Sequence, residues 1–284
     1  MDRVPFVFME RVVSLLPADP RKVPELFAPA GRLWKTAATE FKANFRLVKA
    51  FISASDNFMA VTKESLGQRE IEPFEEPNQY TLDLSLFISE YNDWLEDEAP
   101  KGQWELINEK TLRQIINLPT KGDFHSELFV KSLPRRENEV FDFGGLLRNI
   151  QASFAFVSIS SCFGYSQEIE EFLRNLIPRR TCCSFLFDRV DLTSACVDLL
   201  MDTWDTWSPY GDELDRFERP RDISIEDCSQ TFSEAQISRV LNGWCEGRGG
   251  CKLSTTPLEY PDIDAFCETF EIEEPYWSVD EDWS

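Results

Sequence analysis

The chain has 284 residues, 42% of them hydrophobic and 13% aromatic, so it can bury a substantial core and does not have the composition of a disordered protein. Its formal net charge of −22 argues against a nucleic-acid partner, because a phosphate backbone repels an acidic surface. No signal-like segment opens the chain, and no apolar run reaches the roughly 18 residues of a membrane span. We therefore expect an intracellular protein, cytoplasmic or nuclear, with reduced cysteines and no membrane contact.

Residues 1–47 have the apolar spacing of short amphipathic helices separated by prolines. Pro5 suits the first turn of a helix, and a second short piece runs over residues 23–27 before a third helical period begins. The positions of interest are Pro5, Phe8, Val12, Leu15, Leu16, Leu33 and Trp34. The sequence predicts a small helical unit, which is too short to be stable without support from the following chain or from a partner.

An acidic segment lies on each side of residues 80–267. Residues 48–79 are expected to form a connecting helix and an acidic linker, since the stretch EIEPFEEPN combines acids with two prolines and has no apolar period. Residues 268–284 hold seven acids and no base, which predicts a solvated acidic tail. Tyr276, Trp277 and Trp283 leave open that this tail caps the last repeat or docks a partner.

A short apolar pattern recurs through residues 80–267, with two strand-forming residues one apart and a third residue three further on. It occurs at Leu82-Leu84-Phe87, Leu128-Val130-Leu133, Val157-Ile159-Cys162, Phe185-Phe187-Val190, Ile223-Ile225-Cys228 and Cys251-Leu253-Thr256. The first positions are separated by 46, 29, 28, 38 and 28 residues. Amphipathic helices are expected between the later strands, beginning at Ser166, Asp191 and Ser233.

A strand followed by a helix at this spacing predicts parallel strands backed by helices, because a parallel pairing needs a long crossover. Stacked units of this kind form an α/β solenoid. The 46-residue step contains residues 102–119, which predict an extra helix or a degenerate repeat. The 38-residue step contains the insertion 208–220, which is a candidate contact loop.

The chain has no motif that predicts catalysis, a cofactor or a metal. Its one histidine is His125, the adjacent Cys182 and Cys183 do not have zinc-ligand spacing, and the densest glycine run, GRGGCK, is not a phosphate-binding loop. We predict a binding protein and not an enzyme. A hydrolase in which His125 meets a cysteine and an acid remains the third alternative.

Two parts of the sequence resemble known protein families. The repeat pattern resembles the leucine-rich repeat core, with Cys162 and Cys228 at the position that turns the chain off the strand. The segment VPFVFMERVVSLLPADPRKVPELFAPAGRLWKTAATEF resembles a degenerate F-box that starts at Val4-Pro5 and closes with Arg32-Leu33-Trp34. Most of the chain is similar to a lineage-expanded type of nematode F-box-like protein with irregular repeats.

The F-box resemblance implies a substrate-recruiting adaptor of a cullin-type ubiquitin ligase. The N-terminal helices would bind a Skp-type adaptor, and the repeats would capture a protein substrate that the sequence does not identify. The residues implied in adaptor binding are Pro5, Phe8, Val12, Leu15, Leu16, Leu33 and Trp34. The alternative is that these side chains cap the solenoid's own core, in which case the chain is a repeat-based interaction protein with no ubiquitin-ligase link.

Overall fold

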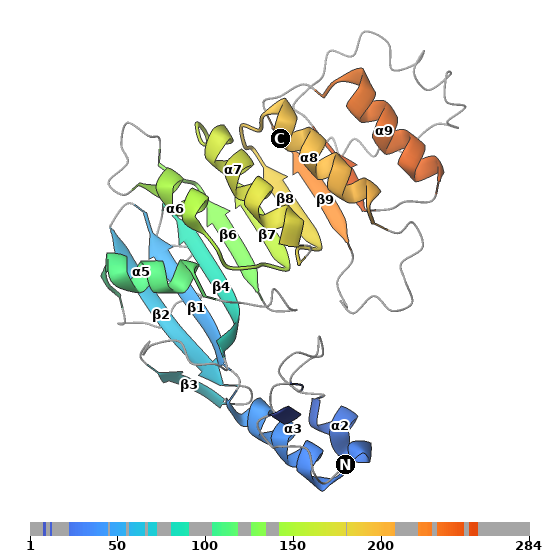
Figure 1. Cartoon of the computed structure of the whole chain (residues 1–284). Coiled ribbons are helices and arrows are strands. Elements are labelled where there is room, and N and C mark those ends of the chain that lie inside the picture. The colour runs from blue at the N-terminus through green and yellow to red at the C-terminus, as the bar shows by residue number, and fades with distance from the viewer. Residues whose placement is uncertain are drawn as a thin grey trace, which may run out of the picture.

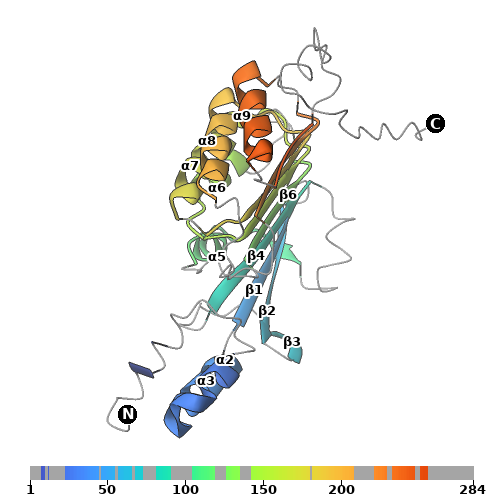
Figure 2. The same cartoon turned by 90° about the vertical axis from the view of Figure 1, so that its right-hand side faces the viewer.

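The protein has a mixed α/β fold in which helices cover one face of a single sheet (Figures 1 and 2). A computed structural model describes residues 8–9, 12, 23–44, 46–54, 57–65, 68–72, 81–90, 104–118, 126–134, 142–179, 181–207, 221–228, 232–246 and 250–254. None of the helices in this described part is long and apolar enough to cross a membrane.

The described strands form one ten-stranded sheet in the order β10-β9-β8-β7-β6-β4-β1-β2-β3, with β5 paired to β2 outside this path. Neighbouring strands from β10 to β1 run parallel, whereas β2, β3 and β5 pair antiparallel. The strand bounds are β1 Arg46–Ser53, β2 Phe58–Ser65, β3 Gln68–Glu72, β4 Thr81–Ser89, β5 Glu105–Leu106, β6 Glu127–Lys131, β7 Phe156–Ser160, β8 Ser184–Asp188, β9 Asp222–Glu226 and β10 Cys251–Leu253.

The helices divide into two groups (Figure 1). A small N-terminal unit lies beyond the antiparallel end of the sheet, and the remaining helices pack in a row on one sheet face (Figure 2). The helix bounds are α2 Val23–Phe27, η1 Ala28–Ala30, α3 Arg32–Asn44, α5 Glu109–Ile116, α6 Phe143–Asn149, α7 Ser166–Leu176, η3 Ile177–Arg179, α8 Ser194–Asp205 and α9 Glu234–Cys245. The extra helix expected within residues 102–119 is therefore confirmed as α5.

Four successive strands, β6 to β9, end in the same turn. The residue after each strand has a left-handed backbone with φ between 50° and 54°; these residues are Ser132, Ser161, Arg189 and Asp227. The N–H of each one donates to a carbonyl at the end of the next strand at 2.8–2.9 Å. The following residue then leaves the sheet, and it is the predicted third position: Leu133, Cys162, Val190 and Cys228.

The expected strands at these places, and their parallel pairing, are confirmed. Leu128 of β6 pairs with Val157 of β7, and Val157 pairs with Phe185 of β8. The series continues through Ile223 of β9 to Cys251 of β10. The first predicted place is shifted, since Leu86 and Ile88, and not Leu82 and Leu84, stand opposite the apolar pair of β6. Phe87 consequently lies inside β4 and does not turn the chain.

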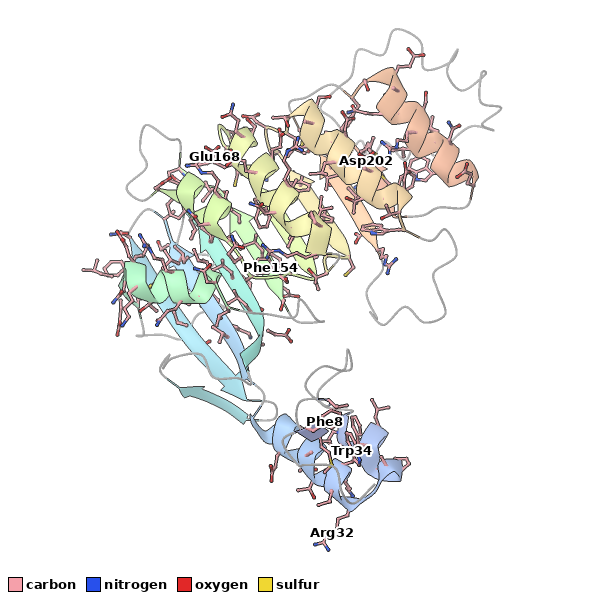
Figure 3. The ribbon with its side chains drawn as sticks, in the orientation of Figure 1. Phe8, Arg32, Trp34, Phe154, Glu168 and Asp202 are labelled. Carbon is pink, nitrogen blue, oxygen red and sulfur yellow. The ribbon has the colours of Figure 1, made fainter. Side chains whose placement is uncertain are left out.

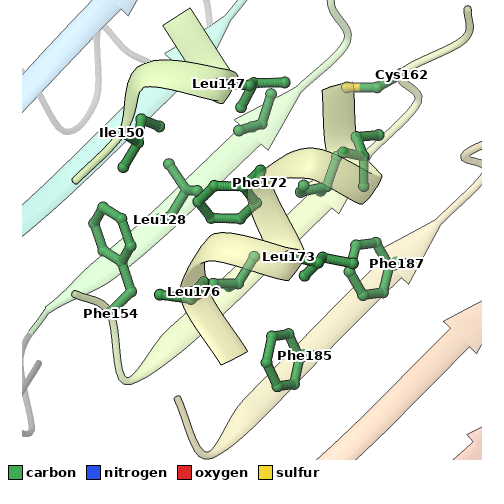
Figure 4. Packing of buried hydrophobic residues seen from close by; sticks show 14 of the residues in the cluster. Leu128, Leu147, Ile150, Phe154, Cys162, Phe172, Leu173, Leu176, Phe185 and Phe187 are labelled. Carbon is green, nitrogen blue, oxygen red and sulfur yellow. The ribbon is translucent and has the colours of Figure 1, made fainter. Parts of the chain in front are cut away.

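The main core fills the space between the sheet and the helices (Figure 4). Alternate strand residues such as Leu128 and Phe185 point into it and meet the apolar stripe of α7, which includes Phe172 and Leu176. Each strand therefore buries only one of its two faces under the helices.

The two cysteines predicted at the third position have equivalent places in this core. Cys162 and Cys228 are both buried. Each thiol donates to the carbonyl two residues earlier, at 3.1 Å for Cys162 and 3.5 Å for Cys228. Burial raises the pKa of Cys162 to about 12 and that of Cys228 to about 11, so both remain neutral thiols at physiological pH.

Of the three predicted helix starts, one is confirmed as an N-cap. Ser233 caps α9 in a capping box with Gln236. Ser166 is the first residue of α7 and makes no cap, and the cap of α8 is Thr193, so the assignment of Asp191 is wrong. The Asp191 carboxylate instead accepts from the Gly164 N–H at 3.2 Å, which ties the loop after β7 to the loop after β8.

The connecting helix expected within residues 48–79 is wrong. The described residues in this region form the antiparallel strands β1, β2 and β3. In β1, Val48, Ala50 and Ile52 alternate into the main core, a period of two that fits a strand and not a helix. The acidic tail, the insertion 208–220 and His125 lie outside the described residues.

Candidate protein-binding surfaces

The N-terminal unit is a compact pair of helices around a sharp turn. Gly31 has a φ of 110°, a conformation that favours glycine, and it joins the η1 turn to α3. The turn brings Phe27 and Trp34 together, with their rings stacked 5.3 Å apart and almost parallel. Ala37, Ala38 and Met9 are fully buried, so this unit has internal packing of its own.

The described members of the predicted adaptor-binding set are either exposed or partly buried; Figure 3 labels two of them, Phe8 and Trp34. Phe8 is 55% exposed and Leu33 is 45% exposed. Trp34 and Val12 are partly buried, and the stacking on Phe27 gives Trp34 a packing role within the unit. Pro5, Leu15 and Leu16 lie outside the described residues.

Leu26 is a further surface residue that the predicted set does not contain. It is 59% exposed on α2, next to Phe27, whose ring stacks on Trp34. A helix of five residues is too short for periodicity to show which side faces outward, so the sequence carried no clear signal for it. Three large exposed apolar side chains, Phe8, Leu26 and Leu33, on so small a unit suggest an interaction surface.

The second candidate surface is the sheet face opposite the helices, which carries a row of aromatic rings. Phe51, Phe87 and Phe129 stand directly opposite one another on β1, β4 and β6. Their rings stack at centroid distances of 5.0 and 5.1 Å, and Phe156 of β7 continues the row at 5.2 Å from Phe129. Such cross-strand pairs stabilise a sheet; Phe51 is 1% exposed, and Phe87, Phe129 and Phe156 are partly buried.

The row extends toward the antiparallel edge of the sheet. Phe51 forms a separate small cluster with Ala60, Phe87 and Trp104, distinct from the main core. At the edge, Phe58 pairs with Leu106 of β5, and Leu106 is 66% exposed. The face opposite the helices is therefore mixed, with Phe51, Ala60 and Phe87 beside the buried polar residues Ser53, Thr62 and Ser85. The row contains a single phenylalanine from each of β1, β4, β6 and β7, so no strand carried a sequence signal for it by itself.

The described residues give little support to nucleophilic or metal chemistry. They contain no group of three or more histidine, cysteine or acidic side chains that could hold a metal ion. A cavity of about 470 Å³ between η3, α8 and the start of β8 is lined in part by Cys182. Burial raises the pKa of that thiol well above its usual value, so little of it is the reactive thiolate.

Comparison of this chain with protein-family models, with curated proteins and with solved structures found no match. The geometry of the two surfaces is consequently the basis for assigning a role.

Proposed function

We propose that this protein is a substrate-recruiting adaptor of a cullin-type ubiquitin ligase. The N-terminal unit binds a Skp-type adaptor, and the repeated strands and helices hold a protein substrate. The observation that carries this proposal is the exposure of Phe8, Leu26 and Leu33 on a small helical unit that precedes the sheet. Full burial of an exposed apolar side chain contributes about 1.5–3 kcal/mol before entropy costs, so these three residues would act as anchors within a larger interface.

The proposal includes an irregular leucine-rich-repeat-like solenoid for the region from β4 to β10. Support for it comes from the common turn after β6, β7, β8 and β9 and from the neighbouring order of these strands. In each turn a backbone N–H donates a hydrogen bond to a carbonyl of the next unit. Contacts between neighbouring units of this kind hold stacked repeats together. The substrate surface is assigned to the helix-free sheet face with its aromatic row.

A second candidate function is a repeat-based interaction protein with no ubiquitin-ligase link. The packing of Trp34 on Phe27 favours it, because this residue of the box-like segment serves the unit's own interior. The direct passage from α3 to β1, with one residue between them, also suits helices that cap the sheet.

Binding of the purified chain to a Skp-type adaptor distinguishes the two. Leu33→Asp places a charge on the exposed side of α3, and we expect it to weaken adaptor binding by about tenfold or more, because an interface would desolvate that charge. Leu106→Asp, at a more exposed leucine on β5 and outside the N-terminal unit, is the matched control and should bind as the wild type does. Circular dichroism of both variants should be unchanged.

The outcome that would leave the second function standing is a folded wild-type chain that does not bind the adaptor. If Leu33→Asp binds the adaptor as tightly as the wild type does, the surface around Leu33 is not the adaptor-binding site. Trp34→Ala is not suitable as the primary test, since loss of its stack on Phe27 would unfold the unit.

A further inference from the structure

Two adjacent cysteines just before β8, Cys182 and Cys183, direct their thiols toward the same backbone oxygen. Both sulfur atoms donate to the Ala155 carbonyl, Cys182 at 3.5 Å and Cys183 at 3.1 Å. Neither cysteine is part of a disulfide. Consecutive residues of a strand point to opposite faces, so this convergence depends on the backbone leaving the strand conformation at these two positions. Because the two sulfur atoms share one acceptor, rotation of the side chains lets a single bound atom meet both.

The thiol pair lies at the wall of a cavity. Cys182 and Cys183 both line the space of about 470 Å³ between η3, α8 and the start of β8. Cys182 is partly exposed and Cys183 is 2% exposed. The volume is typical of sites for small organic molecules. The apolar part of the lining comes from η3, β8 and the C-terminal half of α8, and it includes Ile177, Phe185, Leu199 and Trp207; Phe185 is labelled in Figure 4.

The protonation state of the pair and the number of donors exclude an ordinary metal site. Burial raises the pKa of Cys182 well above its usual value, and the adjacent Cys183 raises it further. Metal cations bind thiolates, so they would have to displace these protons. The described residues also contain no group of three or more histidine, cysteine or acidic side chains that could hold a metal ion. Two neutral thiols instead suit an atom that bonds covalently to sulfur and releases the protons in water.

We propose that Cys182 and Cys183 capture a trivalent organoarsenical, R–As=O, whose apolar group R occupies the cavity. Arsenic(III) with one organic group has two remaining bonds to form, which is the number of thiols in the pair. Both S–H bonds break, two As–S bonds form, and the arsenic oxygen leaves as water with the two protons. Arsenic stays trivalent, so nothing is oxidised or reduced. The site uses none of the residues of the two protein-binding surfaces and does not depend on the proposed function.

The pairing of the thiols is what gives the site its affinity. Once one As–S bond has formed, the second forms within the same molecule, at the high effective concentration of a tethered group. A monothiol such as glutathione gains no such advantage. The other buried cysteines with a described turn position, Cys162 and Cys228, have no cysteine next to them in the chain. Retention of the arsenical in excess glutathione therefore distinguishes the pair from a single thiol.

The probe is phenylarsine oxide, added to the reduced full-length chain with excess glutathione before desalting and intact mass spectrometry. We expect one phenylarsenic group per chain, with a mass increase equal to the probe less one water. Trypsin cleaves after Arg180 and Arg189 and releases residues 181–189, which contain no cysteine besides Cys182 and Cys183. The label should be found on this peptide alone.

Substitution of either thiol should abolish retention. Cys182→Ser and Cys183→Ser each leave a single As–S bond, which glutathione exchanges. Cys228→Ser is the matched control, because that thiol also donates to a backbone carbonyl, at 3.5 Å, but lies outside the cavity. It should retain the label as the wild type does, and circular dichroism should be unchanged in all three variants. The peptide map of the wild type locates the site even if one variant does not fold.

The role of the cavity is tested with methylarsine oxide, which has a methyl group in place of the phenyl ring. The folded chain should prefer the phenyl compound by about tenfold or more, because the cavity buries the ring. In urea, where the cavity is absent, this preference should be lost.

Three results would overturn the proposal: label on a peptide other than residues 181–189, full retention by Cys182→Ser, or equal capture of the two arsenicals by the folded chain. No adaptor is present in this assay, so its failure is distinct from failure of the adaptor-binding test.

Discussion

Replacing Gly243 by alanine tests whether α8 and α9 pack as closely as the structure requires. The added Cβ would overlap three atoms of the Trp204 ring, the farthest at 3.1 Å. Trp204 is fully buried, so the ring cannot turn into solvent. Overpacking of this kind costs about 1–3 kcal/mol, and the better helix propensity of alanine returns about 1 kcal/mol. We expect a net loss of up to about 2 kcal/mol in the free energy of unfolding.

The assay is urea unfolding followed by circular dichroism, with the midpoint and slope compared between variants. Asn242→Ala, at the exposed neighbouring position, is the control and should be neutral or stabilising by less than about 0.7 kcal/mol. Trp204→Leu should cost about 2–4 kcal/mol by itself. In that background the overlap is gone, so Gly243→Ala should become neutral or stabilising.

Additive effects of Gly243→Ala and Trp204→Leu, within about 0.5 kcal/mol, would refute this reasoning. That result would mean that the glycine does not face the tryptophan.

Two further predictions concern buried polar groups of the repeats. Tyr165→Phe should lower the free energy of unfolding by about 1–2 kcal/mol, because the hydroxyl donates at 2.8 Å to the carbonyl of Pro134 and its loss leaves a buried acceptor unpaired. Alkaline pH should destabilise the wild type more than Cys162→Ala, because burial raises the pKa of the Cys162 thiol from 9.0 to about 12. The difference should grow by about 1.4 kcal/mol per pH unit above pH 9, measured by urea unfolding under reducing conditions.

The sign of the pH effect follows from proton binding. Between about pH 9 and 12 the folded state keeps the Cys162 proton while the unfolded state loses it, so stability present below pH 9 is lost as pH rises. An identical pH dependence for the wild type and Cys162→Ala would contradict this account. For Tyr165→Phe, an unchanged unfolding midpoint would show that the Pro134 carbonyl has another donor.

Neither candidate surface could be predicted fully from the sequence. Leu33 and Trp34 are neighbours in a box-like motif, yet one is exposed and the other stacks on Phe27, because consecutive helical residues point about 100° apart. Which of the two faces outward depends on where α2 packs. The aromatic row on the sheet could not be predicted from the sequence either, because Phe51, Phe87 and Phe129 are far apart in the chain and meet only through strand pairing.

The sequence by itself determined the parallel strands from β6 to β10, because two apolar residues one apart and a third after a turn are a local signal. It also determined the Ser233 cap, which depends on residues within one helical turn. Only the tertiary structure decided that Leu86 and Ile88 of β4 enter the register, and that Gly243 meets Trp204. Local spacing fixes the type of an element, whereas its partner is chosen by contacts between distant residues that no local pattern contains.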